Sequence, residues 1–271
     1  MRCGSGTARG INVVWILLRG LTRETAHWGS FPEDFRKALP AAHVISLDLP
    51  GNGRLHLAPS LGSIGAMVAF CRDELAERQV EPPYRLLAMS LGAMVATEWA
   101  YRFPGEISGC VLVNTSFKAF SPFYRRLRPR NYFALVKLAL LPNDAGAVER
   151  TILRLTSSDA GKREEIIASW ADTRRLRPVT SVNALRQLLA ALRYRARAAP
   201  PAAPLLLLSS MRDGLVHTEC SLTIASRWNC ALAVHPSAGH DIALDDPQWM
   251  IERVQHWLFK KPGRAQATSQ N

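Results

Sequence analysis

The chain has 271 residues, of which 48% are apolar and 21% charged, and its formal net charge is +12. That apolar content can bury a substantial core, which excludes a disordered or fibrous protein. The five cysteines are too few for a disulfide framework and form no pair with metal-ligand spacing. We therefore expect a globular cytoplasmic protein.

Short apolar runs that end at polar or turn residues predict six strands. In chain order they are Asn12–Leu18, His43–Asp48, Tyr84–Met89, Gly109–Asn114, Leu205–Ser209 and Ala231–His235. Helical periodicity between them predicts helices over Phe31–Leu39, Ile64–Arg78, Leu91–Phe103, Thr218–Trp228 and Asp246–Phe259. This alternation predicts an α/β fold with a mostly parallel sheet of about six strands, flanked by helices.

The first apolar run, Ile11–Leu18, is too short to span a bilayer, and no small-residue cleavage site follows it. We interpret it as a buried strand rather than a signal peptide. We expect no transmembrane segment elsewhere in the chain.

The alternation fails between Lys118 and Ala198, where apolar residues recur at helical spacing. Three helices are predicted there, over Tyr132–Leu141, Val148–Leu155 and Val182–Leu192. We interpret residues 118–198 as a helical insertion into a core of residues 11–117 and 199–260, with disordered tails at 1–10 and 261–271. The insertion holds about 17 Lys and Arg against about 6 Asp and Glu, so about eleven of the twelve excess charges lie within it.

A serine follows the third predicted strand at a sharp strand-to-helix turn. Ser90 comes directly after Tyr84–Met89, and a helical pattern begins at once. Ala88 and Gly92, two residues before and after it, are small enough for strand and helix to pack closely around an exposed nucleophile. The alternative is an ordinary buried serine in a strand–helix turn.

A serine nucleophile needs a histidine as its base and a carboxylate that orients the histidine. His240 and Asp213 each follow a predicted strand, at the sheet edge where catalytic groups gather. Their order after Ser90 is the one expected for this architecture. The rivals for the acid are Asp241, Asp245 and Asp246. Capping of the following helix explains the last two, and the first should point away if His240 points in.

Acyl transfer also needs donors for the oxyanion that develops on the substrate. The residue after the nucleophile, Leu91, supplies one backbone N–H. The loop Arg19–Thr22 directly follows the first strand, which makes the Leu21 N–H the second candidate for the oxyanion hole.

With these residues placed, the chain resembles the α/β-hydrolase superfamily from Asn12 to Phe259. The resemblance rests on Arg19-Gly20, where the family commonly has His-Gly, on Asp48-Leu49-Pro50-Gly51-Asn52-Gly53, on the turn at Ser90, and on Asp213 with Gly239-His240. It implies the α/β-hydrolase fold, with the helical insertion as a cap domain after the fourth strand. One departure from the family is that the first predicted strand begins after only about ten residues, which leaves no room for the usual preceding hairpin, so we expect a trimmed sheet edge.

The main departure from the family is Arg19 at the usual histidine position. This arginine can favour an anionic substrate or pair with a carboxylate. We favour pairing, with Glu24 or Asp48 as the partner.

The predicted triad fixes a reaction class. Ser90 attacks an acyl carbonyl, His240 takes and returns the proton, and water releases the acyl group, with no metal or cofactor. Carboxyl esters are the leading substrates, followed by thioesters, lactones and activated C–C bonds. Epoxides and haloalkanes are disfavoured, because similar proteins that cleave them use an aspartate as the nucleophile.

The arginines of the insertion carry a signal about specificity. Arg125, Arg126, Arg128 and Arg130 fall close together, and further arginines follow at Arg150, Arg154, Arg174, Arg175, Arg177, Arg193, Arg195 and Arg197. A solvated helical face is one interpretation. The other is a docking surface for an acidic partner such as an acyl carrier protein, for which pimeloyl carrier-protein methyl ester esterases are the comparison that the resemblance offers.

The remaining hypothesis is a non-catalytic binding protein on a hydrolase scaffold, whose basic insertion holds nucleic acid or anionic membrane. The complete set of triad residues argues against it. Nucleic acid is also disfavoured because helical packing explains the tyrosines among the arginines as readily as base stacking does.

Overall fold

The computed structural model describes residues 13–140, 144–159 and 163–259. The predicted tails, residues 1–10 and 261–271, lie outside the described residues, as do Asn12 and Leu141 at the ends of two predicted elements. None of the described helices is both long and apolar enough to cross a membrane.

A six-stranded sheet in the order β2-β1-β3-β4-β5-β6 forms the centre of the described chain. Its strands are β1 (Val13–Leu18), β2 (Ala42–Leu47), β3 (Tyr84–Met89), β4 (Ile107–Val113), β5 (Leu205–Ser210) and β6 (Ala231–His235). Neighbouring strands pair in parallel throughout this sheet. The predicted fold class is confirmed, with strand ends displaced by one or two residues.

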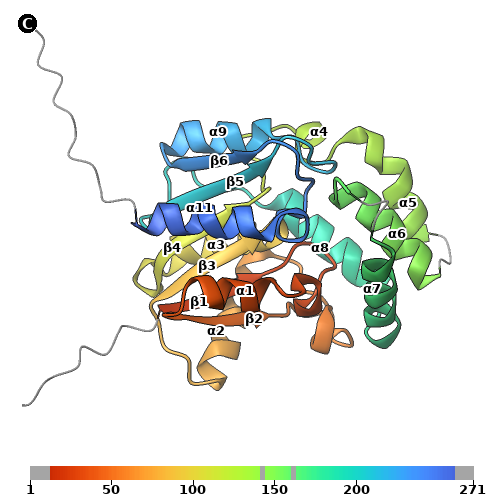
Figure 1. Ribbon diagram of the computed structural model, residues 1–271, viewed down its shortest axis with the longest axis horizontal. Helices are drawn as coiled ribbons and strands as arrows, with labels where there is room; N and C mark the ends of the chain where they lie inside the picture. The colour runs from red at the N-terminus through yellow and green to blue at the C-terminus, as the bar shows by residue number, and fades with distance from the viewer. Residues whose placement is uncertain (1–12, 141–143, 160–162, 260–271) are drawn as a thin grey trace, which may run out of the picture.

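Helices between the strands cover both faces of the sheet. One face carries α1 (Phe31–Ala38), α10 (Ile242–Asp245) and α11 (Pro247–Phe259), and the other carries α2 (Ile64–Glu77), α3 (Leu91–Arg102) and α9 (Glu219–Trp228). Short 3-10 turns are η1 (Thr25–Trp28), η2 (Gly53–Leu55) and η3 (Pro104–Glu106). Figure 1 shows α1 and α11 crossing in front of the sheet.

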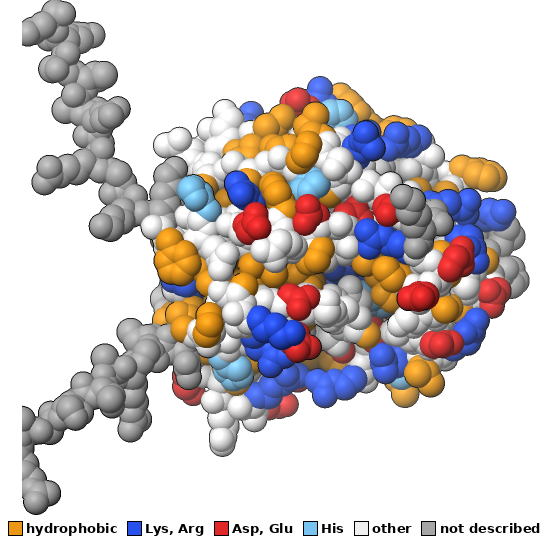
Figure 2. Space-filling view, in the orientation of Figure 1, with side chains coloured by type: hydrophobic (Ala, Val, Ile, Leu, Met, Phe, Trp, Pro, Cys, Tyr) orange, Lys and Arg blue, Asp and Glu red, His pale blue; other side chains and the backbone are white. Residues whose placement is uncertain are grey.

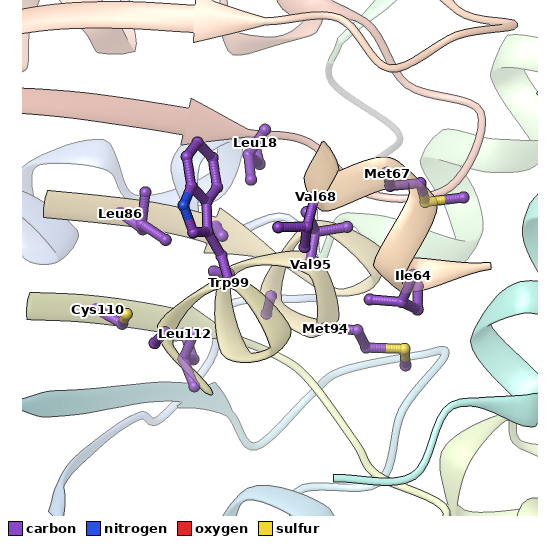
Figure 3. Close-up of a cluster of buried hydrophobic side chains, with 14 of the residues drawn as sticks. Leu18, Ile64, Met67, Val68, Leu86, Met94, Val95, Trp99, Cys110 and Leu112 are labelled. Atoms are coloured by element: carbon purple, nitrogen blue, oxygen red, sulfur yellow. The ribbon is translucent and has the colours of Figure 1, made fainter. Parts of the chain in front are cut away.

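Each strand sends alternate side chains into two separate cores, because successive side chains of a strand point to opposite faces. In β3, Leu86 and Ala88 join the core under α2 and α3, whereas Leu87 and Met89 join the core under α1 and α11. Figure 3 shows side chains from α2, α3 and the strands gathered in the first of these cores, with Trp99 among them. Burial on both faces explains why the strands are apolar runs rather than alternating patterns.

Residues 118–198, called the insert below, lie between β4 and β5. They contain α4 (Phe123–Arg126), η4 (Pro129–Asn131), α5 (Tyr132–Leu140), α6 (Ala145–Thr156), α7 (Glu164–Leu176) and α8 (Ser181–Arg193), and no strand among the residues described there. Figure 1 shows α5, α6 and α7 at one end of the sheet, on the right. The sequence pattern did not predict α7, because Ile167, Trp170 and Ala171 make only a short buried stripe among charged residues.

Candidate active site

Ser90 lies between β3 and α3 in a backbone conformation that few side chains adopt. Its φ of 50° and ψ of −111° are strained for a residue with a Cβ, and strain of this kind collects at functional turns. Its carbonyl oxygen accepts the N–H groups of Ala93 and Met94 at 3.1 and 3.3 Å, which begins α3. Gly92 is needed here, because a Cβ would lie 2.6 Å from two carbonyl oxygens at the end of β1. The turn therefore has the sharp geometry that the sequence predicted.

The loop after β1 passes beside Ser90. A Cβ placed on Gly20 would lie 3.9 Å from the Ser90 Oγ. Leu21 and Leu91 line the same cavity as Ser90. Within the described part of the chain, neither backbone N–H donates a hydrogen bond to a protein acceptor. Both groups are thus available to an oxyanion, and that role stays a prediction.

Asp213 and His240 follow β5 and β6, and their side chains meet. The Nδ1–H of His240 donates to Oδ2 of Asp213 at 2.7 Å. The other carboxylate oxygen accepts the N–H groups of Leu215 and Val216 at 2.7 and 2.9 Å. The pair is buried, with Asp213 2% exposed and His240 7%. Because Asp213 occupies Nδ1, Nε2 is the ring nitrogen left for a partner in the cavity that His240 and Ser90 both line.

The surroundings of His240 make it a stronger base. Burial alone lowers its pKa, but the charge of Asp213 and the hydrogen bond to it raise it more, and the resulting pKa lies above the ordinary 6.5. Asp241 adds a smaller upward shift and Arg19 a smaller downward one. A histidine whose protonated form is stabilised in this way is suited to taking a proton from a hydroxyl.

Asn114, at the end of β4, connects the loops that carry His240 and Asp213. Its Nδ2 donates to the backbone oxygen of His240 at 2.8 Å, and its Oδ1 accepts the N–H of Ser210 at 2.9 Å. We did not single it out as a site residue from the sequence, although a polar residue at the end of a strand on this edge was a usable signal. It fixes the position of the histidine relative to the strand that precedes Asp213.

The His240 loop also rests against the insert. A Cβ on Gly239 would lie 2.5 Å from the backbone oxygen of Thr156 at the end of α6, so only glycine fits there. The same oxygen accepts the N–H of Asp241 at 2.8 Å. The end of α6 thus packs directly on the backbone beside the histidine.

Arg19 pairs with Asp241, so the prediction of Glu24 or Asp48 as its partner was wrong. Its Nη1 and Nη2 donate to the two carboxylate oxygens of Asp241 at 3.1 and 2.5 Å, and the pair is buried. Glu24 instead accepts from Arg177, and the Asp48 carboxylate accepts backbone N–H groups near it. Both expected partners are therefore already occupied.

Asp241 faces inward beside His240, which corrects the expectation that the two would point to opposite sides. Burial would raise the pKa of Asp241, but the charge of Arg19 and its hydrogen bonds lower it more. The capping explanation holds for Asp246, which accepts the N–H of Trp249 at 2.9 Å. It fails for Asp245, which accepts from the backbone of Gly239 and from residues of the insert.

A second buried ion-pair network joins the loop after β1 to the insert. Glu149 of α6 is fully buried and accepts from Nη1 of Arg23 and Nε of Arg174, each at 2.6 Å. Burial lowers the pKa of Arg23, and the charge of Glu149 partly offsets this. The network makes Glu149 a bridge between the insert and the loop that carries Leu21.

A neutral bridge lies beside this network. Gln187 of α8 is fully buried, and its Oε1 accepts the N–H of Thr22 at 2.8 Å. Its Nε2 donates to Asn52 at 3.0 Å and to Ser60 at 2.9 Å. The insert thus holds the loop after β1 through both charged and neutral contacts.

The arginines predicted as a docking surface do not share one environment. Arg125 and Arg130 are exposed, and Arg128 is half-buried. Arg126 is only 7% exposed, lines the cavity, and donates to two carbonyl oxygens in the last turn of α8. Its prediction as part of a docking surface was wrong, because the one-turn helix α4 directs this side chain toward α8.

Several arginines of the insert that follow Arg130 form ion pairs with carboxylates. Those in ion pairs are Arg150, Arg163, Arg174, Arg175 and Arg177. On the face drawn in Figure 2, basic and acidic side chains are interspersed over the insert end of the molecule. The insert is therefore less uniformly basic at its surface than its composition suggests.

Ser90, His240, Leu21 and Leu91 line one cavity of about 340 Å³, and Asp213 reaches it only through its hydrogen bond to His240. Its size lies near the lower end of the ~300–1,000 Å³ typical of small-molecule sites. About half of the lining residues belong to the insert, and most of these are apolar; they include Leu135, Leu138, Val148, Ile152, Leu155, Leu185 and Leu188. Such a wall suits the hydrocarbon part of an acyl substrate.

The parallel sheet and the strained serine turn at its carboxyl edge define a protein of the α/β-hydrolase class. Comparison with known families agrees with this assignment. The chain belongs to the alpha/beta hydrolase family, whose family model matches residues 15–253.

The chain shares less than 30% sequence identity with the individual relatives described here. The chain is 27% identical to the biotin biosynthesis bifunctional protein BioHC of Cellvibrio japonicus over 258 residues, which are 89% of this chain and 47% of the relative. It therefore spans about half the length of this curated relative. Two solved structures share the fold. A hydrolase from Pseudomonas aeruginosa has a TM-score of 0.74 and 18% identity, over 94% of this chain and 92% of that chain. A thermophilic esterase from Thermogutta terrifontis has a TM-score of 0.69 and 20% identity, over 91% of this chain and 89% of that chain.

Proposed function

We propose that this protein is a serine hydrolase that cleaves a carboxyl ester, or a related acyl bond, through an acyl-enzyme intermediate. Ser90 is the nucleophile, His240 the general base and Asp213 the residue that orients the histidine. The observation that carries the proposal is the buried 2.7 Å hydrogen bond from His240 to Asp213, because His240 lines the same cavity as Ser90. The family of the chain supports the reaction class.

The proposed reaction has two halves. The Ser90 Oγ attacks the ester carbonyl while Nε2 of His240 takes its proton, and the N–H groups of Leu21 and Leu91 stabilise the oxyanion. His240 then gives the proton to the leaving alcohol, which leaves an acyl group on Ser90. Water then attacks the acyl carbonyl while His240 takes its proton, and His240 returns that proton to the Ser90 Oγ as the free acid leaves.

The insert serves as a cap domain in this proposal, on a core of residues 11–117 and 199–260. Its apolar side chains line a large part of the cavity wall, and the end of α6 packs on the His240 loop. This arrangement favours esters with a hydrocarbon acyl chain over small polar ones, because burial of that chain is favourable.

The first test is covalent labelling with a fluorophosphonate probe, followed by hydrolysis of p-nitrophenyl esters of increasing chain length. We expect labelling of the wild type and none of Ser90→Ala or His240→Ala, with ester turnover lowered by about 10⁴-fold or more. Ser116→Ala is the matched control, because Ser116 lines the same cavity and has no role in the proposed reaction. A folded wild type that neither labels nor cleaves any ester contradicts the proposal and favours a binding protein on a hydrolase scaffold.

A second candidate is hydrolysis of an ester or thioester on an acyl carrier protein. It is favoured by Arg125 and Arg130, which are exposed and lie within three positions of Leu127 of the cavity wall in the sequence. Exposed arginines of this kind can pair with an acidic partner. The similarity to the biotin biosynthesis protein BioHC also favours it. Arg126 is excluded from this surface by its burial.

A further inference from the structure

The cavity wall carries more positive charge than the carboxylates around it neutralise. The arginines that line it are Arg19, Arg23, Arg126 and Arg174. Asp241 pairs with Arg19, and Glu149 is shared between Arg23 and Arg174. Arg126 forms no ion pair with any carboxylate of the described residues. It is therefore the least compensated of the four cations.

The contacts of Arg126 leave part of its hydrogen-bonding capacity unused. Its Nη2 donates to the backbone oxygen of Ala191 at 2.7 Å, and its Nη1 donates to that of Leu192 at 3.3 Å. Its Nε is buried and has no partner among the described residues. A guanidinium has five N–H donors in a planar fork, so these two bonds leave an unsatisfied edge on a side chain that is more than nine-tenths buried.

The hydrogen bonds to the last turn of α8 explain where the Arg126 side chain lies. They do not neutralise its full positive charge. The C-terminus of a helix attracts cations, yet it carries only about half an elementary negative charge. Burial of a full charge is costly unless a counter-charge is present, and burial lowers the pKa of Arg126. The neighbouring wall residues Leu127, Ala191 and Leu192 offer no acidic side chain. The missing counter-charge is one that a ligand can bring.

We propose that Arg126 binds a carboxylate of the substrate, so that the preferred ester carries a carboxylate group on its acyl part. This inference rests on the proposed ester hydrolysis at Ser90. The half-esters of dicarboxylic acids belong to this class: Ser90 attacks the ester at one end while the planar guanidinium of Arg126 donates hydrogen bonds to the carboxylate at the other. Carboxylates match the donor geometry of arginine better than any neutral group does.

The test compares two matched substrate series. One contains mono-p-nitrophenyl esters of linear dicarboxylic acids of increasing length, and the other contains neutral p-nitrophenyl esters of equal chain length. We expect the wild type to prefer the charged ester at one chain length by at least about tenfold in kcat/KM, mainly through KM, because the carboxylate is bound in both ground and transition states. In Arg126→Met this preference should fall to about one.

The controls separate binding from structure. Arg186→Met changes an exposed arginine of α8 that does not line the cavity, and it should keep the wild-type ratio of charged to neutral turnover. If Arg126 only holds α8, its replacement should lower both series together and leave the ratio unchanged. If Arg126→Met does not fold, Arg126→Lys is used in its place. We then expect the charged-to-neutral ratio of kcat/KM to fall only in part, because lysine keeps the positive charge but lacks the planar guanidinium.

The outcomes are distinguishable. Turnover of neutral esters that requires Ser90, without any preference for charged ones, overturns this inference and leaves the proposed function standing. A preference that survives in Arg126→Met, or that disappears in Arg174→Met instead, also overturns the assignment to Arg126. A folded protein that cleaves neither series overturns the proposed function, and this inference with it.

Discussion

At the scale of single residues, burial and Asp213 shift the pKa of His240 in opposite directions. Burial favours its neutral form, whereas Asp213 favours the protonated one and prevails. A general base works only when it is neutral, so activity should be lost as the pH falls through this raised pKa. The position of the acid limb of the pH–rate profile therefore reports on Asp213.

We expect Asp213→Asn to shift the acid limb of log kcat/KM to lower pH. The substitution removes the charge that raises the His240 pKa and leaves the burial that lowers it. The plateau should also drop by about 10⁴-fold, because the histidine loses its oriented tautomer. The measurement is the pH–rate profile on a p-nitrophenyl ester. The control is Asp246→Asn, which changes a carboxylate paired with His235 and should leave the acid limb in place. An acid limb that does not move in Asp213→Asn would contradict the role of Asp213 as the partner of His240.

The three proposed triad residues could be chosen from the sequence because each one follows a predicted strand, and parallel strands bring their carboxyl ends to one edge. The partner of Arg19 could not be found in this way. Asp241 is 222 positions away in the chain, and its backbone is fixed by a hydrogen bond to Thr156 of the insert, a contact that exists only in the folded structure. Pairing between side chains of distant loops depends on their orientation, which periodicity does not encode.

At the scale of elements, α6 is attached to the core through Glu149. This side chain is fully buried between Arg23 and Arg174, so its removal leaves two guanidinium groups without a carboxylate. Loss of one member of a buried ion pair is far more costly than loss of an exposed one, because the remaining charge cannot recover its hydration. The attachment of the insert therefore depends strongly on this one residue.

We expect Glu149→Gln to lower the free energy of unfolding by about 3–5 kcal/mol. Glu164→Gln is the matched control, since it breaks an exposed pair with Arg150 and should cost less than about 1 kcal/mol. Equilibrium denaturation of both variants in urea provides the comparison. Similar small losses in the two variants would show that the Glu149 network contributes little to stability.

The helices of the insert differ in how well the sequence predicted them. α8 was expected because Val182–Leu192 repeats apolar residues at helical spacing over its whole length. α7 was not expected, since its buried positions are few and its charged residues serve contacts that only the folded structure reveals, such as Arg174 with Glu149. Amphipathic periodicity identifies a helix by its apolar face and fails where ion pairs do part of the packing.

At the scale of the whole molecule, a net charge of +12 concentrated in the insert suggested a basic docking surface. The structure divides those arginines among buried, ion-paired and exposed positions. Composition counts charges but not their partners, and this is why the sequence placed Arg126 on the wrong surface. A smaller exposed set, which includes Arg125 and Arg130, remains for a partner.

If a carrier protein docks there, salt should affect two substrates differently. Charges at an exposed interface are screened over about 10 Å at ~0.1 M salt, whereas an uncharged ester in the cavity is unaffected. We expect kcat/KM on a carrier-bound ester to fall steeply with salt while that on a neutral p-nitrophenyl ester barely changes. An Arg125→Gln, Arg130→Gln double variant should flatten the first dependence. Equal salt dependence of both substrates would remove the docking hypothesis.

The parallel sheet also determines how the chain reaches its native state. Adjacent parallel strands cannot be joined by a tight hairpin, so every pairing needs a long connection. β4 and β5 are neighbours in the sheet, yet Cys110 pairs with Leu205, 95 positions later, with the whole insert between them. Loops of this length must close before their contacts become favourable, which slows folding. The insert that lines a large part of the cavity wall thus also delays completion of the sheet, and β4 exposes an unpaired edge until it has closed.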